Sequence, residues 1–213
     1  MSKKAIIFDF DGVLIDSVNI KNKAFKEIVK NKNKTIKKKF IQYHYKNLGI
    51  SRKVKFKYLL KNLLKKKNIN QGINFLSKKF NKLIFNKILK KKLNKGVIKF
   101  LEKYKKKYIY FISSGTPQDE LNLILRKKKI DSYFYKIYGS PDNKHLHIKK
   151  IINDYAFSKK NLIFVGDGES DFRAASKSKI KFVQIGNNFK SKKQSLKIDQ
   201  FHEIENLIIL KKF

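Results

Sequence analysis

Short apolar runs of strand length recur along the chain. They span residues 5–10, 108–113, 136–138, 162–165 and 181–185. The longer runs are continuous rather than alternating, which is typical of strands covered on both faces, as in a parallel sheet. We therefore predict that these runs form one buried parallel sheet.

Apolar residues between the later runs follow helical spacing. Residues 97–104 and 121–125 each place their apolar side chains on one helical face, and Pro117 stands at a suitable start for the second of these helices. A third helix is predicted around residues 148–155. Alternating strands and helices favour right-handed crossovers and an α/β fold with a doubly wound parallel sheet.

The interval between residues 17 and 93 contains no convincing strand, and its apolar residues recur at helical spacing. We predict a helical cap domain of residues 17–93, inserted into a core domain of residues 1–16 and 94–213 and lying over the carboxyl edge of the sheet. Turns are expected at Gly49 and at residues 68–72. Residues 198–210 are expected to form a short helix that packs on the core.

The charge of the chain is extreme, at a formal net +37 in 213 residues. Only three of the 53 basic residues are arginine, and the lysines are spread over nearly every predicted helix. Because nucleic-acid readers favour arginine, we interpret the charge as compositional and expect no specific nucleic-acid partner, although weak RNA binding at low salt would follow from it.

Other features of composition narrow the setting. The chain has no cysteine, and no apolar run approaches the length of a membrane span. We expect a cytoplasmic protein with no membrane partner, and the sequence leaves its oligomeric state open.

Acidic, hydroxyl and amine side chains follow the predicted strands where the apolar runs end. They are Asp9 and Asp11 after the first run, Ser113 and Ser114 after the second, Lys144 after the third, and Asp167 and Asp171 after the fourth. Because ligands of open parallel sheets bind outside the carboxyl ends of the strands, we expect these side chains to share one site.

The residue types at these positions suit Mg²⁺ and a phosphoryl group. Asp9 and Asp167 offer carboxylates, and the backbone carbonyl of Asp11 offers a further oxygen of the kind Mg²⁺ prefers. Lys144 is placed to neutralise a phosphoryl group, and Gly12 permits a turn that presents backbone N–H groups to an anion.

Four motifs occur in order: "FDFDGVLIDS", "YFISSG", "GSPDNK" and "FVGDGESD". Together they resemble the haloacid dehalogenase superfamily of phosphohydrolases over essentially the whole chain. The helical insertion between the first two motifs is similar to the cap of the phosphoglycolate phosphatase and β-phosphoglucomutase branch.

The resemblance implies roles for individual residues. Asp9 resembles the nucleophile that forms an aspartyl-phosphate, and Asp11 resembles the general acid/base. Ser113 and Lys144 resemble the phosphoryl binders, with Ser114 as the alternative hydroxyl. Asp167 resembles a Mg²⁺ ligand, and Asp171 a supporting acid of the metal site.

The predicted cap contains a stretch, residues 43–56, that combines His44, Arg52 and Lys55. We interpret Arg52 as a residue that selects the substrate by binding a second anionic group, with Lys55 and His44 assisting. The alternative is a joint between two helices with exposed charges. Two further histidines, His145 and His147, are expected at the surface rather than as metal ligands.

The sequence thus favours an enzyme, a Mg²⁺-dependent phosphatase of a small phosphorylated metabolite. A sugar phosphomutase with the same motifs is the alternative, and a basic nucleic-acid-binding protein on an inactive scaffold is a third, disfavoured hypothesis. Dehalogenase and phosphonate-cleaving chemistries are disfavoured, because relatives with these activities usually lack an acid two positions after the nucleophile, where this chain has Asp11.

Overall fold

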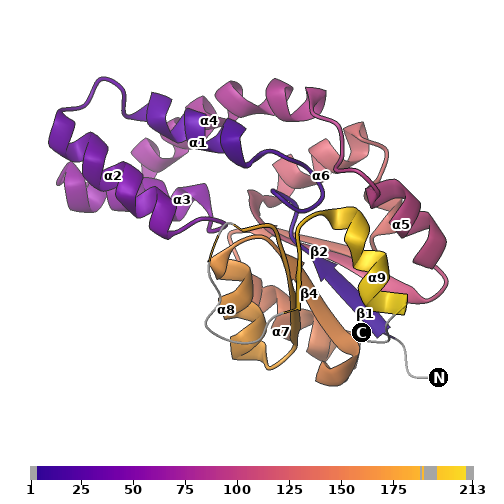
Figure 1. Ribbon diagram of the computed structural model, residues 1–213. Helices are drawn as coiled ribbons and strands as arrows, with labels where there is room; N and C mark the ends of the chain where they lie inside the picture. Colours follow the sequence, from indigo (N-terminus) through magenta and orange to yellow (C-terminus); the bar gives the residue numbers. More distant parts are fainter. Residues whose placement is uncertain (1–3, 188, 190–195, 210–213) are drawn as a thin grey trace.

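The computed structural model describes residues 4–187, 189 and 196–209. In this part of the chain, six parallel strands form one sheet in the order β3-β2-β1-β4-β5-β6 (Figure 1). The strands are β1 (Lys4–Phe8), β2 (Tyr108–Pro117), β3 (Lys136–Ser140), β4 (Leu162–Gly166), β5 (Lys181–Ile185) and β6 (Leu196–Ile198). The predicted α/β fold with a doubly wound parallel sheet is confirmed.

Helices cover both faces of this sheet. They are α5 (Val97–Tyr104), α6 (Gln118–Lys127), α7 (Lys144–Asp154), α8 (Glu169–Ser178) and α9 (Ile204–Ile209), with single 3₁₀ turns at Asp131–Tyr133, Lys159–Asn161 and Phe201–Glu203. Buried residues of α5 and α6 share a cluster with Ile6 and Phe8, whereas those of α7 and α8 share one with Ala5 and Ile7. Alternate residues of β1 therefore face opposite layers, which explains its unbroken apolar run.

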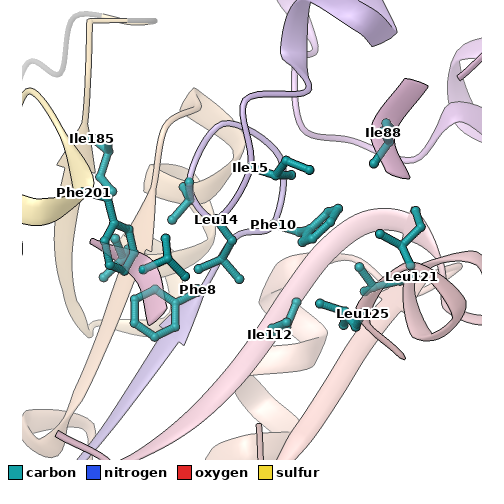
Figure 2. Packing of buried hydrophobic residues seen from close by; sticks show 14 of the residues in the cluster. Phe8, Phe10, Leu14, Ile15, Ile88, Ile112, Leu121, Leu125, Ile185 and Phe201 are labelled. Atoms are coloured by element: carbon teal, nitrogen blue, oxygen red, sulfur yellow. The ribbon is translucent and has the colours of Figure 1, made fainter. Parts of the chain in front are cut away.

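The first layer is built around β1 and the turn that follows it. Phe8, Phe10 and Leu14 are fully buried there, together with Ile112 of β2 and Leu121 of α6 (Figure 2). Because the turn after β1 is anchored by its own apolar side chains, the polar residues between them are held in fixed positions.

The interval after this turn is helical. It contains α1 (Val18–Ile28), α2 (Lys34–Lys46), α3 (Arg52–Lys57), which continues into a π-helical segment (Tyr58–Leu63), and α4 (Asn70–Lys90). Their buried faces meet in a group of aromatic rings. The centre of the Phe25 ring lies within about 6 Å of the ring centres of Phe40, Phe56 and Phe80. The division into a core domain and a cap domain of residues 17–93 stays a prediction.

The two ends of the helical insertion lie side by side next to the sheet. Ile15 forms an antiparallel bridge with Leu93, and the side chain of Asn94 donates to the carbonyl of Val13 at 2.8 Å. This crossing fixes the inserted helices beside the carboxyl end of β1.

Three sequence-based boundaries were wrong. Phe10 lies in the turn after β1, although it is as buried as the strand. Ile198 ends the short edge strand β6 instead of starting a helix, and Leu210 lies outside the described residues. Gly72 lies inside α4, where a Cβ would stand 2.9 Å from Leu60; glycine there permits close packing rather than a turn.

Candidate active site

The turn after β1 places Asp9 and Asp11 at the carboxyl edge of the sheet. The backbone N–H of Asp9 donates to the carbonyl of Val165 at 2.9 Å, so the ladder with β4 continues to this residue. The side chain of Asp9 is buried, and its Oδ1 accepts a hydrogen bond from the N–H of Phe10 at 2.7 Å.

Three buried carboxylates converge at this edge. Asp9 after β1, Asp167 after β4 and Asp171 in the first turn of α8 each offer one oxygen, and these oxygens lie within 4.8 Å of one another. Asp171 also accepts a hydrogen bond from the N–H of Gly168 at 3.1 Å. Carboxylates so close together repel one another unless a cation is present, and a hard divalent cation such as Mg²⁺ prefers this donor set.

Lys144, at the start of α7, supplies one positive charge to this cluster. Its Nζ lies 2.8 Å from Asp9 and is also bonded to Asp171. Burial lowers the pKa of Lys144, but Asp171 and Asp9 outweigh that effect and raise it above its usual value. Burial raises the pKa of Asp9 well above its ordinary range, and Lys144 opposes that shift.

Gly12 is required by the close approach of the β1 turn to Asp167. Its φ is +83°, and a Cβ at this position would stand 2.0 Å from Oδ2 of Asp167. A side chain at position 12 would therefore displace the carboxylate, in addition to straining the backbone.

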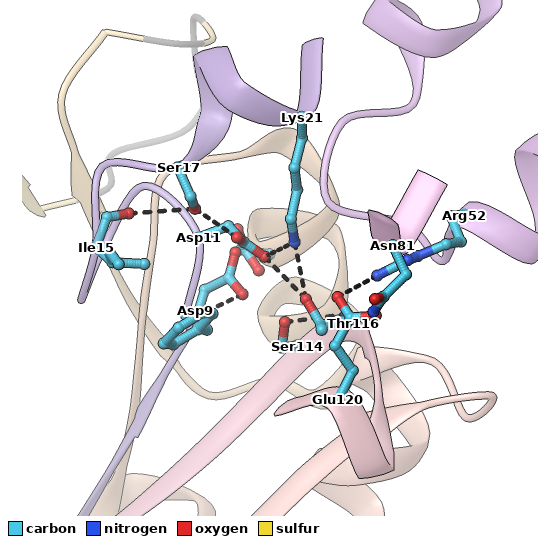
Figure 3. Close-up of polar contacts among 12 residues, drawn as sticks. Asp9, Asp11, Ile15, Ser17, Lys21, Arg52, Asn81, Ser114, Thr116 and Glu120 are labelled. Carbon is cyan, nitrogen blue, oxygen red and sulfur yellow. Dashed lines mark hydrogen bonds and ion pairs between the residues drawn. The ribbon is translucent and has the colours of Figure 1, made fainter. Parts of the chain in front are cut away.

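Asp11 belongs to a different group of contacts, formed with the start of α1 and the end of β2 (Figure 3). Its carboxylate accepts hydrogen bonds from Ser17 and from Lys21, and a third from Thr116 Oγ1 at 3.1 Å. Lys21 Nζ also donates to Thr116 Oγ1 at 2.8 Å. Burial raises the pKa of Asp11, but the ion pair with Lys21 and these hydrogen bonds hold it below its usual value.

The two serines after the apolar run of β2 point to different partners. Ser113 Oγ lies 2.8 Å from Nδ1 of His147, whereas Ser114 Oγ accepts a hydrogen bond from the N–H of Thr116 at 3.1 Å. Ser114 lines a cavity of about 400 Å³ together with Lys144, and Ser113 is not among the described residues that line it. The placement of His147 at the surface was wrong, because it is fully buried against Ser113 and Tyr138.

A second, smaller cavity connects the site with the inserted helices. Asp9 and Asp11 line it on one side, and His44, Arg52 and Lys55 line it on the other. The structure thus brings all three cap residues to this cavity, and their part in selecting the substrate stays a prediction. All three are buried, which excludes the alternative of a joint with exposed charges at these positions.

The partner of Arg52 was not predicted. Its guanidinium forms a buried ion pair with Glu120 of α6, lies 4.7 Å above the ring of Phe80, and shares Glu120 with the side-chain amide of Asn81 (Figure 3). Lys21 of α1 was also missed, because no local pattern distinguishes it from the many other lysines. Both contacts depend on how the inserted helices rest on the core.

Within the described residues, every helix is too short or too polar to span a lipid bilayer.

Comparison with known proteins supports a shared ancestry over most of the chain. The family model described as haloacid dehalogenase-like hydrolase matches residues 6–185. A search of curated proteins found no match.

Solved structures similar to this chain have the same fold along their whole length. β-Phosphoglucomutase from Clostridium difficile has a TM-score of 0.78 at 20% identity, covering 99% of this chain and 96% of that one. A predicted phosphoglycolate phosphatase from Haemophilus somnus has a TM-score of 0.72 at 18% identity, covering 98% and 99%. A candidate hydrolase from Bacillus subtilis, solved with bound magnesium, has a TM-score of 0.69 at 12% identity, covering 98% and 99%. From the family match and this architecture, we conclude that the chain belongs to the haloacid dehalogenase-like hydrolases.

Proposed function

We propose that this enzyme is a Mg²⁺-dependent phosphatase that hydrolyses a small phosphorylated metabolite through an aspartyl-phosphate. The observation that carries the proposal is the convergence of Asp9, Asp167 and Asp171 around Lys144 at the carboxyl edge of the sheet. Such a site combines a nucleophilic carboxylate, ligands for a divalent cation and a fixed positive charge.

The donor set fits Mg²⁺. Asp9 and Asp167 would hold the ion, with Asp171 close enough to support it, and the backbone carbonyl of Asp11 would add an oxygen ligand. When bound, the ion supplies charge stabilisation for the phosphoryl oxygens.

In the first step, a carboxylate oxygen of Asp9 attacks phosphorus and the bond from phosphorus to the alcohol oxygen breaks. Asp11 must first take up a proton, against the ion pair with Lys21 that lowers its pKa, before it can give that proton to the departing alkoxide, and Lys144 stabilises the charge on the phosphoryl oxygens. Ser114 is the hydroxyl beside Lys144 in the larger cavity, whereas Ser113 lies 2.8 Å from Nδ1 of His147.

In the second step, Asp11 takes a proton from water as the water oxygen attacks phosphorus. The bond between phosphorus and Asp9 breaks, which releases inorganic phosphate and restores both carboxyl groups. Ser17, Lys21 and Thr116 orient Asp11 through the hydrogen bonds described above.

The experiment measures phosphate release from a panel of phosphorylated metabolites, with Mg²⁺ or with a chelator. We expect release that requires Mg²⁺ and is lost in Asp9→Asn. Asp16→Asn is the matched control, because Asp16 is exposed and pairs only with Lys91 at the surface among the described residues. Release that persists in Asp9→Asn would contradict the proposal.

The same panel separates the phosphatase from the phosphomutase alternative. A mutase passes the phosphoryl group of Asp9 to a sugar hydroxyl, so it isomerises sugar phosphates without stoichiometric phosphate release. Isomerisation by the wild type that is lost in Asp9→Asn would show that the phosphoryl group is passed to a sugar rather than to water. The role of Asp9 as the nucleophile would be unchanged.

A further inference from the structure

The cavity between the site and the inserted helices is lined by three cationic side chains, and two of them are already neutralised. Lys21 pairs with Asp11, and Arg52 pairs with Glu120. The third cation, Lys55, takes part in no ion pair within the described part of the chain. Among the described residues that line the cavity, Lys55 is therefore the cation that, once protonated, has no carboxylate partner within the protein.

Lys55 is held in place by neutral groups. Its side chain is only 2% exposed, its Nζ lies 3.0 Å from Nδ1 of His44, and it lies 4.8 Å from the centre of the Phe25 ring. On the other side of the imidazole, Nε2 of His44 lies 2.9 Å from Oδ1 of Asn22. Since the Asn22 carbonyl accepts, the proton of His44 resides on Nε2, and Nδ1 accepts from Lys55.

This arrangement uses one of the three N–H groups of a protonated Lys55. The ring of Phe25 offers a weak electrostatic contact to the amine, and His44 takes a single hydrogen bond. At least one donor therefore stays available on a side chain that lines the same cavity as Asp9 and Asp11.

The charged groups around Lys55 act in both directions. The pKa of Lys55 is lowered to about 7, mainly by burial; Lys21 of α1 and Lys144 of α7 contribute to the lowering, whereas Asp11 of the β1 turn opposes it. His44 of α2 stays neutral, because burial and the neighbouring lysines Lys55 and Lys26 lower its pKa to about 3. The amine is thus costly to charge in the free enzyme, and an anion brought beside it would favour its protonated form.

We propose that Lys55 is the specificity-determining residue of this cavity and binds a second anionic group, a carboxylate or a phosphate, on the alcohol portion of the substrate. Arg52, which the sequence suggested for this role, instead positions α3 and α4 on α6 through Glu120 and Asn81. The inference rests on the proposed phosphatase function and names the class of substrate for the same site.

The proposal has a consequence for pH. An anionic group can pair with Lys55 only while the amine is protonated. The contribution of this ion pair to substrate binding is therefore fully present below a pH of about 7 and weakens as the pH rises above it. A substrate without the second anion gains nothing from this charge, and its kinetics are not expected to change through this residue.

The test compares matched substrates that differ in this one charge. 2-Phosphoglycolate is paired with the compound in which an amide replaces its carboxylate. Ethanediol bisphosphate is paired with 2-hydroxyethyl phosphate, which lacks the second phosphate. In one or both pairs, we expect kcat/KM to be about 10- to 100-fold higher for the member that carries the second anion, near neutral pH, as for a charge-assisted hydrogen bond. The preference should decline above a pH of about 7, and the better pair identifies carboxylate or phosphate.

Lys55→Met should lower kcat/KM for the members that carry the second anion to the level of their partners, which abolishes the preference and its pH dependence. Lys57→Met is the matched control, because Lys57 is an exposed lysine on the same helix. The comparison of wild-type enzyme across the substrate pairs needs no variant, so it stands even if Lys55→Met folds poorly.

Two different failures are distinguishable. Equal kcat/KM for the members with and without the second anion, or an unchanged preference in folded Lys55→Met, would overturn the role of Lys55 and leave the phosphatase proposal standing. Loss of phosphate release from every compound, with folded enzyme and Mg²⁺, would overturn the proposed function itself.

Discussion

At the scale of single residues, the site depends on close approaches that particular side chains permit. Gly12 lets the β1 turn pass against Asp167, and Lys144 fills the space between Asp9 and Asp171. The acids and Lys144 could be predicted because each lies within about six residues after an apolar run, in motifs that resemble those of the family. His147 could not, because its burial depends on the packing of α7 beside β2 rather than on neighbouring residues.

Gly12→Ala should reduce phosphatase activity by at least about 100-fold, the loss expected when a catalytic group is displaced by about 1 Å. A Cβ at this position overlaps Asp167, so the carboxylate of Asp167 must move away from those of Asp9 and Asp171. Steady-state kinetics and Mg²⁺ titration measure the effect. Gly186→Ala is the control, since Gly186 also has a positive φ but has open space around its Cβ position. Equal activity of the two variants would contradict the account.

Lys55→Met should raise the stability of the protein by roughly 1–3 kcal/mol near neutral pH, because it removes a buried amine that must be charged or give up its proton. The pKa of Lys55 is about 7 in the folded state and 10.5 in the unfolded state, so the unfolded chain binds more protons between these values. Wild-type stability therefore rises with pH in that window.

The advantage of Lys55→Met is thus greatest below a pH of about 7 and shrinks toward a pH of about 10. Denaturant unfolding at several pH values measures it, with Lys57→Met as the reference. An advantage that grows with pH would show that Lys55 is not the buried amine described here.

At the scale of elements, the predictable parts are those with long periodic patterns. The five apolar runs interpreted as strands correspond to β1 to β5, and α5, α6 and α7 lie where apolar spacing placed them, whereas α8 was not predicted. The strand β6 has only three residues and is stabilised by pairing with β5, so no local pattern indicated it. Contacts between the inserted helices and the core, such as Arg52 with Glu120, were equally unpredictable.

The buried pair of Arg52 and Glu120 should couple α3 to α6 energetically. Glu120→Gln leaves a buried guanidinium without its carboxylate, and we expect a loss of about 3–5 kcal/mol in the free energy of unfolding. The double variant Arg52→Met/Glu120→Met should lose less than the sum of the single variants Arg52→Met and Glu120→Met, which complete the cycle.

Denaturant unfolding of the single and double variants gives the coupling energy directly. Glu102→Gln is the control, because Glu102 pairs with Lys105 at the surface and should change stability little. Additive losses at Arg52 and Glu120 would mean that the two side chains do not interact in solution.

At the scale of the whole molecule, the net charge of +37 surrounds an acidic site with a positive field. Such a field attracts phosphorylated substrates over long distances, and salt screens it because the Debye length falls from about 30 Å at 0.01 M to about 8 Å at 0.15 M. The composition therefore has a kinetic consequence even where it has no specific partner.

We expect kcat/KM for an anionic substrate to fall several-fold, up to about tenfold, between these ionic strengths, with kcat unchanged. Steady-state kinetics in increasing NaCl, at constant Mg²⁺, measures this effect. A kcat/KM that is insensitive to salt while binding limits the rate would show that the lysines do not steer the substrate.

The central claim is that Asp9 carries the phosphoryl group between two displacements. Its most direct test is to mix wild-type enzyme and Mg²⁺ with the best substrate of the panel, quench in acid, and search the peptides for a phosphoryl group that hydroxylamine removes. The account predicts that this group is on Asp9 and is absent in Asp9→Asn. Phosphate release at full rate with no phosphoryl group on Asp9 would contradict it.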